Sequence, residues 1–213
     1  MEMIDVIAEM FPDAEAELNY TNPFELTIAV LLSAQTTDVG VNRVTEGLFG
    51  RFKTPEDYLS VEVGEIEQYI KTIGLYRTKA KNIQKLCRDL IDKYGGEIPG
   101  NYDDLVSLAG VGRKTANVVL SVAFDTPRIA VDTHVERISK RLGIARYKDS
   151  PLQVEETLMR KIPPERWSKT HHQLIFFGRY HCLARNPKCH ECPLLEECRE
   201  GQKRLRQGLV KGL

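Results

Sequence analysis

Hydrophobic residues recur every three or four positions along most of the chain, which is the period of an amphipathic α-helix. The clearest run ends at Gly95-Gly96, a pair that is typical of a helix C-terminus. Its apolar positions are Ala80, Ile83, Leu86, Cys87, Leu90, Ile91 and Tyr94. This pattern predicts a long helix that buries one face and stops at the glycines.

Helix starts are marked by prolines and capping residues. Thr54-Pro55 has the N-cap and first-turn proline of a helix, and Pro151 and Pro163-Pro164 mark later starts. Only Arg128–Val131 offers a candidate strand, and it is short. The pattern therefore predicts an all-α protein of about ten helices joined by short loops.

The bulk composition is that of a soluble protein with a sizeable core. A chain of 213 residues with 42% hydrophobic residues suffices for one large domain or two small ones. The longest apolar run, Leu26–Ala34, is far shorter than the ~20 residues that span a bilayer. The N-terminus is acidic and lacks the pattern of a secretory signal. We therefore expect a cytoplasmic protein with no membrane association.

The net charge of zero conceals an uneven distribution along the chain. Residues 1–70 hold 14 acidic and 3 basic residues, a balance of −11, whereas residues 71–213 hold 16 acidic and 27 basic residues, a balance of +11. One basic face docking on phosphates would show such polarity. Chance drift in the charge of solvated helix faces would show it too, so the asymmetry alone decides nothing.

Four cysteines lie close together near the C-terminus. Cys182, Cys189, Cys192 and Cys198 form a C-x6-C-x2-C-x5-C pattern. Disulfides are rare inside cells, where thiols are kept reduced, so we interpret the four as metal ligands. The fifth cysteine, Cys87, lies apart on an apolar helix face and is interpreted as a core residue.

The spacing of these cysteines leaves two kinds of metal centre open. Structural zinc sites usually have two C-x2-C pairs, and this chain has only one. Longer loops before the other ligands favour a wider [4Fe–4S] cluster over zinc. His181 and His190 adjoin the cysteines and are alternative ligands or neighbours of the site. Arg185 and Lys188, in the first loop between ligands, either contact a nucleic-acid backbone or serve solubility.

A glycine turn between two predicted helices suggests a phosphate site. Asp103–Leu108 is predicted as a short helix, 109–112 as a hairpin and Arg113–Phe124 as a second helix. Gly110 and Gly112 lack a Cβ where the chain must turn tightly or approach a ligand. The N-terminus of the second helix then points N–H groups outward, which suits an anion. Because such turns are common between helices, this evidence is weak by itself.

Lys114 adds a chemical possibility to the turn. An amine must be neutral to attack carbon, and an ordinary lysine with a pKa of about 10.4 is protonated at neutral pH. A helix N-terminus, the adjacent Arg113 and burial under a ligand would all lower that pKa. The alternative is a lysine that only contacts phosphate.

Asp132, eighteen residues after Lys114, also has two interpretations. Thr133-His134-Val135-Glu136 fits a capping box, so that Asp132 would merely precede a capped helix. A carboxylate facing Lys114 would instead stabilise a sugar cation or relay a proton. We expect a break between two domains near Asp125-Thr126-Pro127, with both side chains in the cleft there.

Together these features resemble the endonuclease III family, DNA glycosylases of the helix-hairpin-helix superfamily. The resemblance covers essentially the whole chain. It rests on the four cysteines and on the segments Leu31-Leu32-Ser33-Ala34-Gln35-Thr36-Thr37-Asp38, Ile73-Gly74-Leu75-Tyr76, Gly110-Val111-Gly112-Arg113-Lys114-Thr115-Ala116-Asn117 and Val131-Asp132-Thr133-His134.

The resemblance implies two helical domains with the active site between them. A six-helix barrel containing the helix-hairpin-helix would occupy residues 16–126. A [4Fe–4S] cluster domain would combine residues 1–15 with residues 127–213, with its cluster loop at 182–198. The partner would be double-stranded DNA with oxidised pyrimidines or abasic sites, bound by a monomer that flips the damaged nucleotide out of the helix.

The resemblance also assigns a chemical role to each matched residue. Lys114 would attack the sugar C1′, expel the base and form an imine, after which β-elimination cuts the strand 3′ to the lesion. Asp132 would assist electrostatically and in proton transfer. The four cysteines would hold the cluster. Within the matched segments, the DNA contacts would come from Gln35, Leu75, Gly110, Val111, Gly112, Arg113 and His134. From their place between the cysteines we also expect contacts from Arg185 and Lys188.

Gln35 and Leu75 match the positions that fill the gap left by the extruded nucleotide. An apolar side chain such as Leu75 can replace base stacking. The alternative for Leu75 is a buried core leucine, and the alternative for Gln35 is a polar residue at a helix end. One departure is that Ala109 stands where the family hairpin usually has proline, which would loosen the turn slightly.

Two other functions remain as alternatives. A monofunctional mismatch glycosylase of the same superfamily lacks the hairpin lysine, and adenine-specific members carry a catalytic glutamate in the early helix. The corresponding segment here, Ile28-Ala29-Val30-Leu31, has no acid. A non-catalytic iron–sulfur DNA-binding protein would keep the cysteines and the hairpin but would not need Lys114 and Asp132 together.

Overall fold

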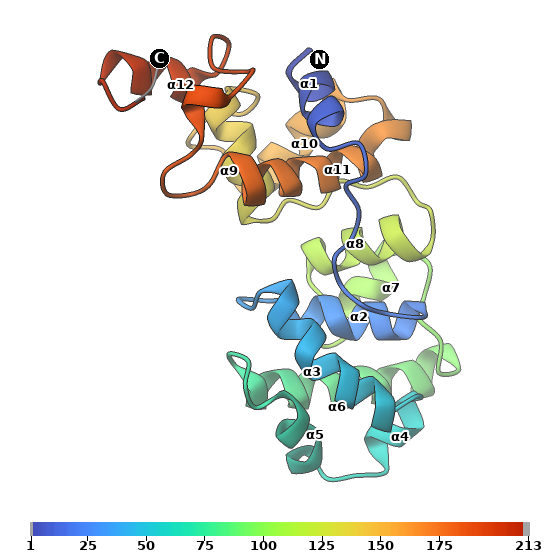
Figure 1. The fold of residues 1–213 in the computed structure, drawn as a ribbon. Helices are drawn as coiled ribbons and strands as arrows, with labels where there is room; N and C mark the ends of the chain where they lie inside the picture. Colours follow the sequence, from blue (N-terminus) through green and yellow to red (C-terminus); the bar gives the residue numbers. More distant parts are fainter. Residues whose placement is uncertain (1, 211–213) are drawn as a thin grey trace. The chain divides into compact units, whose positions relative to one another are not determined.

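The computed structural model describes residues 2–210, and helices are its only regular secondary structure (Figure 1). The all-α prediction is confirmed. Twelve α-helices lie in this part of the chain, against about ten expected, and Arg128–Val131 lies in the loop before α9 and forms no strand. The chain divides into two compact units. Unit 1 joins the N-terminal segment up to Ala16 to the C-terminal segment from Pro127 onward, and unit 2 is Glu17–Thr126.

Unit 2 is built around α2, a helix that is apolar on nearly every side. Nine of its ten residues are buried, because α2 packs against α3, α6 and α8. A helix without a polar face is stable only inside a core. The helices of unit 2 are α2 (Pro23–Leu32), α3 (Asp38–Arg51), α4 (Pro55–Leu59), α5 (Val63–Ile70), α6 (Tyr76–Tyr94), α7 (Tyr102–Ser107) and α8 (Arg113–Ala123).

The long helix α6 follows the predicted hydrophobic pattern. Its buried face includes Ile83, Leu86 and Cys87, which confirms Cys87 as a core residue. Gly95 has φ +62° and Gly96 donates its N–H to the carbonyl of Leu90 at 3.0 Å, so the helix ends at the expected glycines. Helices α4 and α5 pack along α6 and complete this side of the core.

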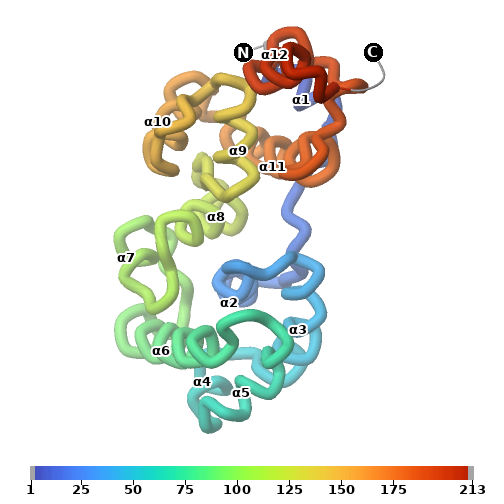
Figure 2. The backbone as a smooth tube through the Cα atoms, turned by 90° about the vertical axis from the view of Figure 1, so that its left-hand side faces the viewer, coloured from blue at the N-terminus to red at the C-terminus, as the bar shows by residue number. Residues whose placement is uncertain are grey.

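Unit 1 brings the two ends of the chain together. The N-terminal helix α1 packs on α11, and Figure 2 shows it among the C-terminal helices. Its buried Ile4 and Ile7 join a core with Ile138, Leu174 and Phe177. The helices of unit 1 are α1 (Glu2–Met10), α9 (Thr133–Leu142), α10 (Pro151–Lys161), η1 (Pro164–Arg166), α11 (Trp167–Phe176), the π-helical turn η2 (Phe177–His181), η3 (Cys189–Glu191) and α12 (Arg199–Arg206).

In the part of the chain that the structure describes, no helix is a candidate for a membrane span. None of its helices combines the length and the apolar character that a bilayer crossing demands.

Candidate functional site

Residues 109–112 form the predicted hairpin between α7 and α8, which pack on each other. Gly110 has φ +78°, and a Cβ at this position would lie 2.8 Å from Cδ1 of Leu31. Any other residue would be both strained and in collision. Gly112 has φ −96°, and a Cβ there would meet nothing within 4 Å. The fold therefore requires Gly110, whereas Gly112 leaves an open approach to the backbone.

The first turn of α8 has the character of an anion site. Gly112 is its N-cap and supplies no side-chain hydrogen bond, and the turn contains no acidic residue. Arg113 occupies the first helical position, with its guanidinium 5.7 Å from the ring centre of Tyr102. Lys114 follows and is exposed. Backbone N–H groups, the helix dipole and two cationic side chains thus share one turn.

Asp132 is the N-cap of α9, which corrects one sequence prediction. One of the two interpretations of Asp132 placed the start of a capping box at Thr133, but Thr133 is already helical. Oδ1 of Asp132 accepts the backbone N–H groups of His134 and Val135, both at 2.8 Å. Aspartate caps a helix at least as well as threonine, and here one oxygen satisfies two N–H groups. Both contacts use Oδ1, so Oδ2 takes no part in the cap.

His134 packs beside Asp132 in the first turn of α9. Its Nδ1 lies 3.3 Å from the guanidinium of Arg137, which also donates to the carbonyl of Gly178 at 2.8 Å. Burial lowers the pKa of His134 below its usual value, and the positive charges of Arg137 and Arg179 act in the same direction. His134 is therefore mostly neutral at pH 7. Sequence reasoning did not identify Arg137, whose spacing of three from His134 was the available signal.

Gln35 and Leu75 share an unusual backbone conformation. Their φ angles are +55° and +58°, and both residues are exposed, Leu75 to 58%. The left-handed region costs a non-glycine residue roughly 1–3 kcal/mol, and such strain persists only where the surroundings impose it. An exposed, strained leucine contributes nothing to the core, so the structure excludes the interpretation of Leu75 as a buried core residue.

The four cysteines of the C-terminal motif line one pocket of unit 1. Most of its wall is apolar, with Phe177, Pro187 and Leu195 among the lining residues. Burial raises the pKa of the Cys192 thiol to about 11 and also raises the pKa values of Cys189 and Cys198. As free thiols, Cys189, Cys192 and Cys198 would stay protonated, and a bound metal centre would be needed to hold them as thiolates.

A [4Fe–4S] cluster needs four thiolates around one site. Among residues 2–210, no three His, Cys, Asp or Glu side chains are arranged to hold one metal ion. All four thiols nevertheless line the same pocket, as the ligands of a larger cluster must. His181 lines it too, is 8% exposed, and its buried Nε2 has no hydrogen-bond partner among the described residues. A polar group such as a cluster sulfide would satisfy that nitrogen.

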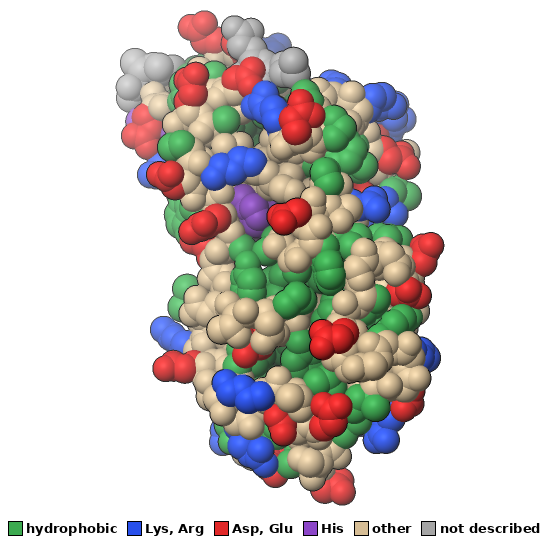
Figure 3. Space-filling model, turned by 90° about the vertical axis from the view of Figure 1, so that its right-hand side faces the viewer, with side chains coloured by type: hydrophobic (Ala, Val, Ile, Leu, Met, Phe, Trp, Pro, Cys, Tyr) green, Lys and Arg blue, Asp and Glu red, His purple; other side chains and the backbone are tan. Residues whose placement is uncertain are grey.

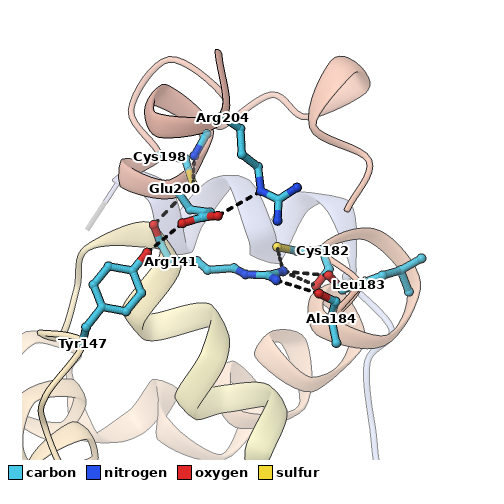
Figure 4. Close-up of polar contacts among 9 residues, drawn as sticks. Arg141, Tyr147, Cys182, Leu183, Ala184, Cys198, Glu200 and Arg204 are labelled. Carbon is cyan, nitrogen blue, oxygen red and sulfur yellow. Dashed lines mark hydrogen bonds and ion pairs between the residues drawn. The ribbon is translucent and has the colours of Figure 1, made fainter. Parts of the chain in front are cut away.

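Arg141, near the end of α9, ties down the loop that follows the first cysteine. Its guanidinium donates to the carbonyl oxygens of Leu183 at 2.7 Å and Ala184 at 2.9 Å, and lies 3.4 Å from Sγ of Cys182 (Figure 4). Arg141 could not be identified from the sequence, because only the packing of α9 brings it to residues some forty positions away. Arg185 and Lys188 follow Ala184 in the same loop, and both are exposed. Nζ of Lys188 lies 3.7 Å from a carboxylate oxygen of Glu191.

A second group of contacts holds the last cysteine. Glu200 accepts from the hydroxyl of Tyr147 and from Nε of Arg204, both at 2.9 Å (Figure 4). The N–H of Gly201 donates to Sγ of Cys198 at 3.3 Å. These contacts attach the start of α12 to the segment after α9, so the position of Cys198 is set by the packing of unit 1.

The surface charges are mixed on the side shown in Figure 3. Lys and Arg side chains alternate there with Asp and Glu, and no purely basic patch is formed on this side. The uneven distribution of charge along the sequence therefore does not produce separate acidic and basic areas on the side shown.

The comparisons with known proteins identify relatives along the whole chain. Residues 28–164 match the HhH-GPD superfamily of base excision DNA repair proteins, and residues 182–198 match the iron-sulfur binding domain of endonuclease III. Endonuclease III of Bacillus subtilis (strain 168) is 67% identical over 208 residues, which are 98% of this chain and 95% of that protein. Endonuclease III of Escherichia coli (strain K12) is 47% identical over 203 residues, 95% of this chain and 96% of that protein.

A solved structure has the same fold. It is a trapped covalent intermediate of an endonuclease III with DNA, the estranged-adenine complex. Its TM-score against this chain is 0.94 at 64% sequence identity, with 95% of each chain covered.

Proposed function

The chain belongs to the HhH-GPD superfamily of base excision DNA repair proteins, and within it to the endonuclease III family, and we propose that it is a bifunctional DNA N-glycosylase and abasic-site lyase acting on oxidised pyrimidines in duplex DNA. Its cofactor is a [4Fe–4S] cluster. The observation that carries the proposal is Lys114, an exposed amine in the first turn of the helix after the hairpin, a turn that has no side-chain cap and no acidic residue and in which Lys114 adjoins Arg113.

The proposed reaction follows from a nucleophilic amine beside bound phosphate. Neutral Nζ of Lys114 attacks C1′ of the damaged nucleotide, and the base leaves with the electrons of the glycosidic bond. Cleavage of the C1′–O4′ bond, with a proton transferred from Nζ to O4′, then opens the sugar ring and converts this amine adduct into an imine. The imine acidifies the C2′ proton, and removal of that proton expels the 3′ phosphate as the C2′–C3′ double bond forms. Water then hydrolyses the imine and restores the amine. Asp132 stabilises positive charge at the sugar and assists proton transfer, with Oδ2 outside the helix cap.

The remaining residues would contact DNA in two ways. Some bind phosphates and position the DNA backbone, and others fill the space left by the flipped nucleotide. The backbone of Gly110 and Gly112 receives a phosphate of the damaged strand, with Arg113 beside it. Val111 lines the same turn, and its N–H donates to the carbonyl of Leu108 at 3.1 Å. His134, Arg185 and Lys188 contact other phosphates. Gln35 and Leu75 enter the space left by the flipped nucleotide, which explains why strained residues are kept on the surface.

The two units correspond to two proposed domains. Residues 16–126 form the barrel domain with the helix-hairpin-helix and Lys114, and residues 1–15 with 127–213 form the cluster domain with Asp132. Cys182, Cys189, Cys192 and Cys198 hold the cluster, which supplies a rigid centre around which the basic loop is folded. We further propose that the protein acts as a monomer on chromosomal DNA.

The two glycines of the hairpin give a matched test of phosphate binding. Gly112→Ala is expected to change the free energy of unfolding by less than about 1 kcal/mol, because its Cβ meets open space. It should weaken binding to abasic-analogue duplex roughly tenfold, since the methyl group holds the phosphate away from the backbone. Gly110→Ala should instead destabilise the protein by about 3 kcal/mol through strain and its contact with Leu31. Urea unfolding and fluorescence anisotropy separate the effects, and an unchanged affinity of Gly112→Ala would argue against the phosphate site.

The proposed function is tested by borohydride trapping. Borohydride reduces an enzyme–DNA imine to a stable secondary amine, so the protein should become covalently attached to duplex DNA containing thymine glycol. A panel of oxidised pyrimidines, an abasic site and base mismatches then ranks the substrates. Release of base without any adduct would identify a monofunctional glycosylase, and binding without base release would identify a non-catalytic DNA-binding protein.

A further inference from the structure

Lys79, on α6 of unit 2, is a lysine inside the protein. It is 4% exposed, although lysine is rarely buried without a partner. Its Nζ donates to the carbonyl oxygen of Leu32 at 2.9 Å, to that of Ala34 at 2.8 Å and to the hydroxyl of Thr36 at 3.0 Å. The protonated amine has three N–H donors, and each of them has an acceptor here.

All three acceptors belong to the turn that follows α2. Leu32 is the last residue of that helix, so the positive charge lies at the negative end of the helix dipole. Ala34 and Thr36 stand on either side of Gln35, the residue with φ +55°. The ammonium group therefore holds the strained residue from both sides.

The same lysine is also joined to the turn that carries Leu75. Leu75 is the N-cap of α6, and the backbone N–H of Lys79 donates to its carbonyl oxygen at 3.0 Å. The two turns approach each other directly, since a Cβ on Gly74 would lie 4.0 Å from the carbonyl oxygen of Gln35. Lys79 thus connects the backbone turns of Gln35 and Leu75, the two residues with positive φ that are proposed to enter the DNA.

We propose that Lys79 is a positioning residue that holds the Gln35 turn and the Leu75 turn as one rigid wedge for nucleotide extrusion. This inference rests on the proposed function, because it takes Gln35 and Leu75 as the gap-filling residues. Lys79 does not contact DNA in this role. Burial disfavours a charged amine and lowers the pKa of Lys79, so core stability alone would be served by an apolar side chain of similar length.

A neighbouring glutamine provides a matched control for lost hydrogen bonds. Gln84 lies on the same helix, and its amide donates to the carbonyl oxygens of Tyr58 at 3.0 Å and Val61 at 2.8 Å. Lys79→Met and Gln84→Met therefore each replace a tether between α6 and a backbone turn with an unbranched apolar side chain. Only the hydrogen bonds of Lys79 reach the turn that contains Gln35.

The experiment compares duplex and single-stranded substrates. Single-turnover strand cleavage is measured on an abasic site in duplex DNA and on the same site in a single strand, where no gap must be filled. Lys79→Met should lose roughly tenfold on the duplex, or about 1.4 kcal/mol, and less than about twofold on the single strand. Gln84→Met should affect both substrates equally. With 2-aminopurine beside an abasic analogue in the duplex, Lys79→Met should also reduce the fluorescence rise that reports unstacking.

The outcomes separate this inference from the proposed function. If Leu75→Ala loses activity selectively on the duplex but Lys79→Met behaves like Gln84→Met, the positioning role is wrong and the proposed function stands. If Leu75→Ala shows no loss of cleavage that is selective for the duplex, Leu75 is not a gap-filling residue. The positioning role proposed for Lys79 is then wrong as well. If wild-type protein forms no borohydride adduct on either substrate, the proposed function itself is wrong. A Lys79→Met loss that is the same on both substrates would show a purely structural role.

Discussion

The Lys114→Ala variant is expected to form no borohydride adduct and to cleave abasic DNA at least about 10⁴-fold more slowly than wild type. The reason is chemical, because alanine has no amine to form the imine through which both base release and β-elimination proceed. Binding to an abasic-analogue duplex should persist, since the N–H groups of the α8 first turn and Arg113 remain. Gel analysis of trapped complexes and anisotropy measure the two effects separately.

Two further variants control this experiment. Lys85→Ala removes another exposed lysine of unit 2, outside the hairpin, and should trap like wild type. Asp132→Asn keeps an oxygen in place of Oδ1 for the N–H groups of His134 and Val135, so the start of α9 is retained while the charge is removed. It should slow cleavage with little change in unfolding. Adduct formation by Lys114→Ala at the wild-type rate would show that a different amine is the nucleophile.

Replacement of a cluster ligand is expected to have the largest effect on stability. Cys189→Ser should lower or abolish the visible absorbance of the iron–sulfur cluster, because a serine hydroxyl is a poor substitute for a thiolate. Unit 1 should lose several kcal/mol, since binding of a structural metal centre contributes directly to folding. Iron and sulfide content, visible absorbance and thermal unfolding are the measurements.

Cys87→Ala is the matched control for ligand replacement. Cys87 is fully buried in the core of unit 2 and lies outside the pocket lined by the other four cysteines. Its replacement should lower stability by the cost of a small cavity and leave the cluster absorbance and iron content at wild-type levels. A native protein that is colourless and contains zinc would contradict the cluster assignment.

Local features of the fold were predictable from the sequence because they depend on neighbouring residues. The period of the apolar positions in α6 identified its buried face, and Gly95 ended the helix through a left-handed conformation that favours glycine. Thr54 forms the predicted N-cap, with Asp57 completing a capping box. Capping at α9 shows the limit of this reasoning, because Asp132 and Thr133 are both good caps and the choice between them depends on where the helix axis begins.

Features of the candidate site that join distant segments were not visible in the sequence. No sequence motif marks Arg141, and the packing of α9 brings it to the loop after Cys182. No sequence motif marks Lys79 either, and it is buried against the end of α2. Each lysine or arginine side chain can face solvent or protein, and the sequence period alone does not distinguish these states for residues at the edge of a buried face.

The sequence by itself determined that the protein is all-helical, where its glycine hairpin lies, and which four thiols are grouped for a metal centre. These follow from residue type and short spacing, which act over one or two helical turns. Only the tertiary structure decided that Gln35 and Leu75 are exposed and strained, that Lys79 holds both turns, and that one apolar pocket collects the thiols. These depend on contacts between residues tens of positions apart, whose geometry is set by helix packing as a whole.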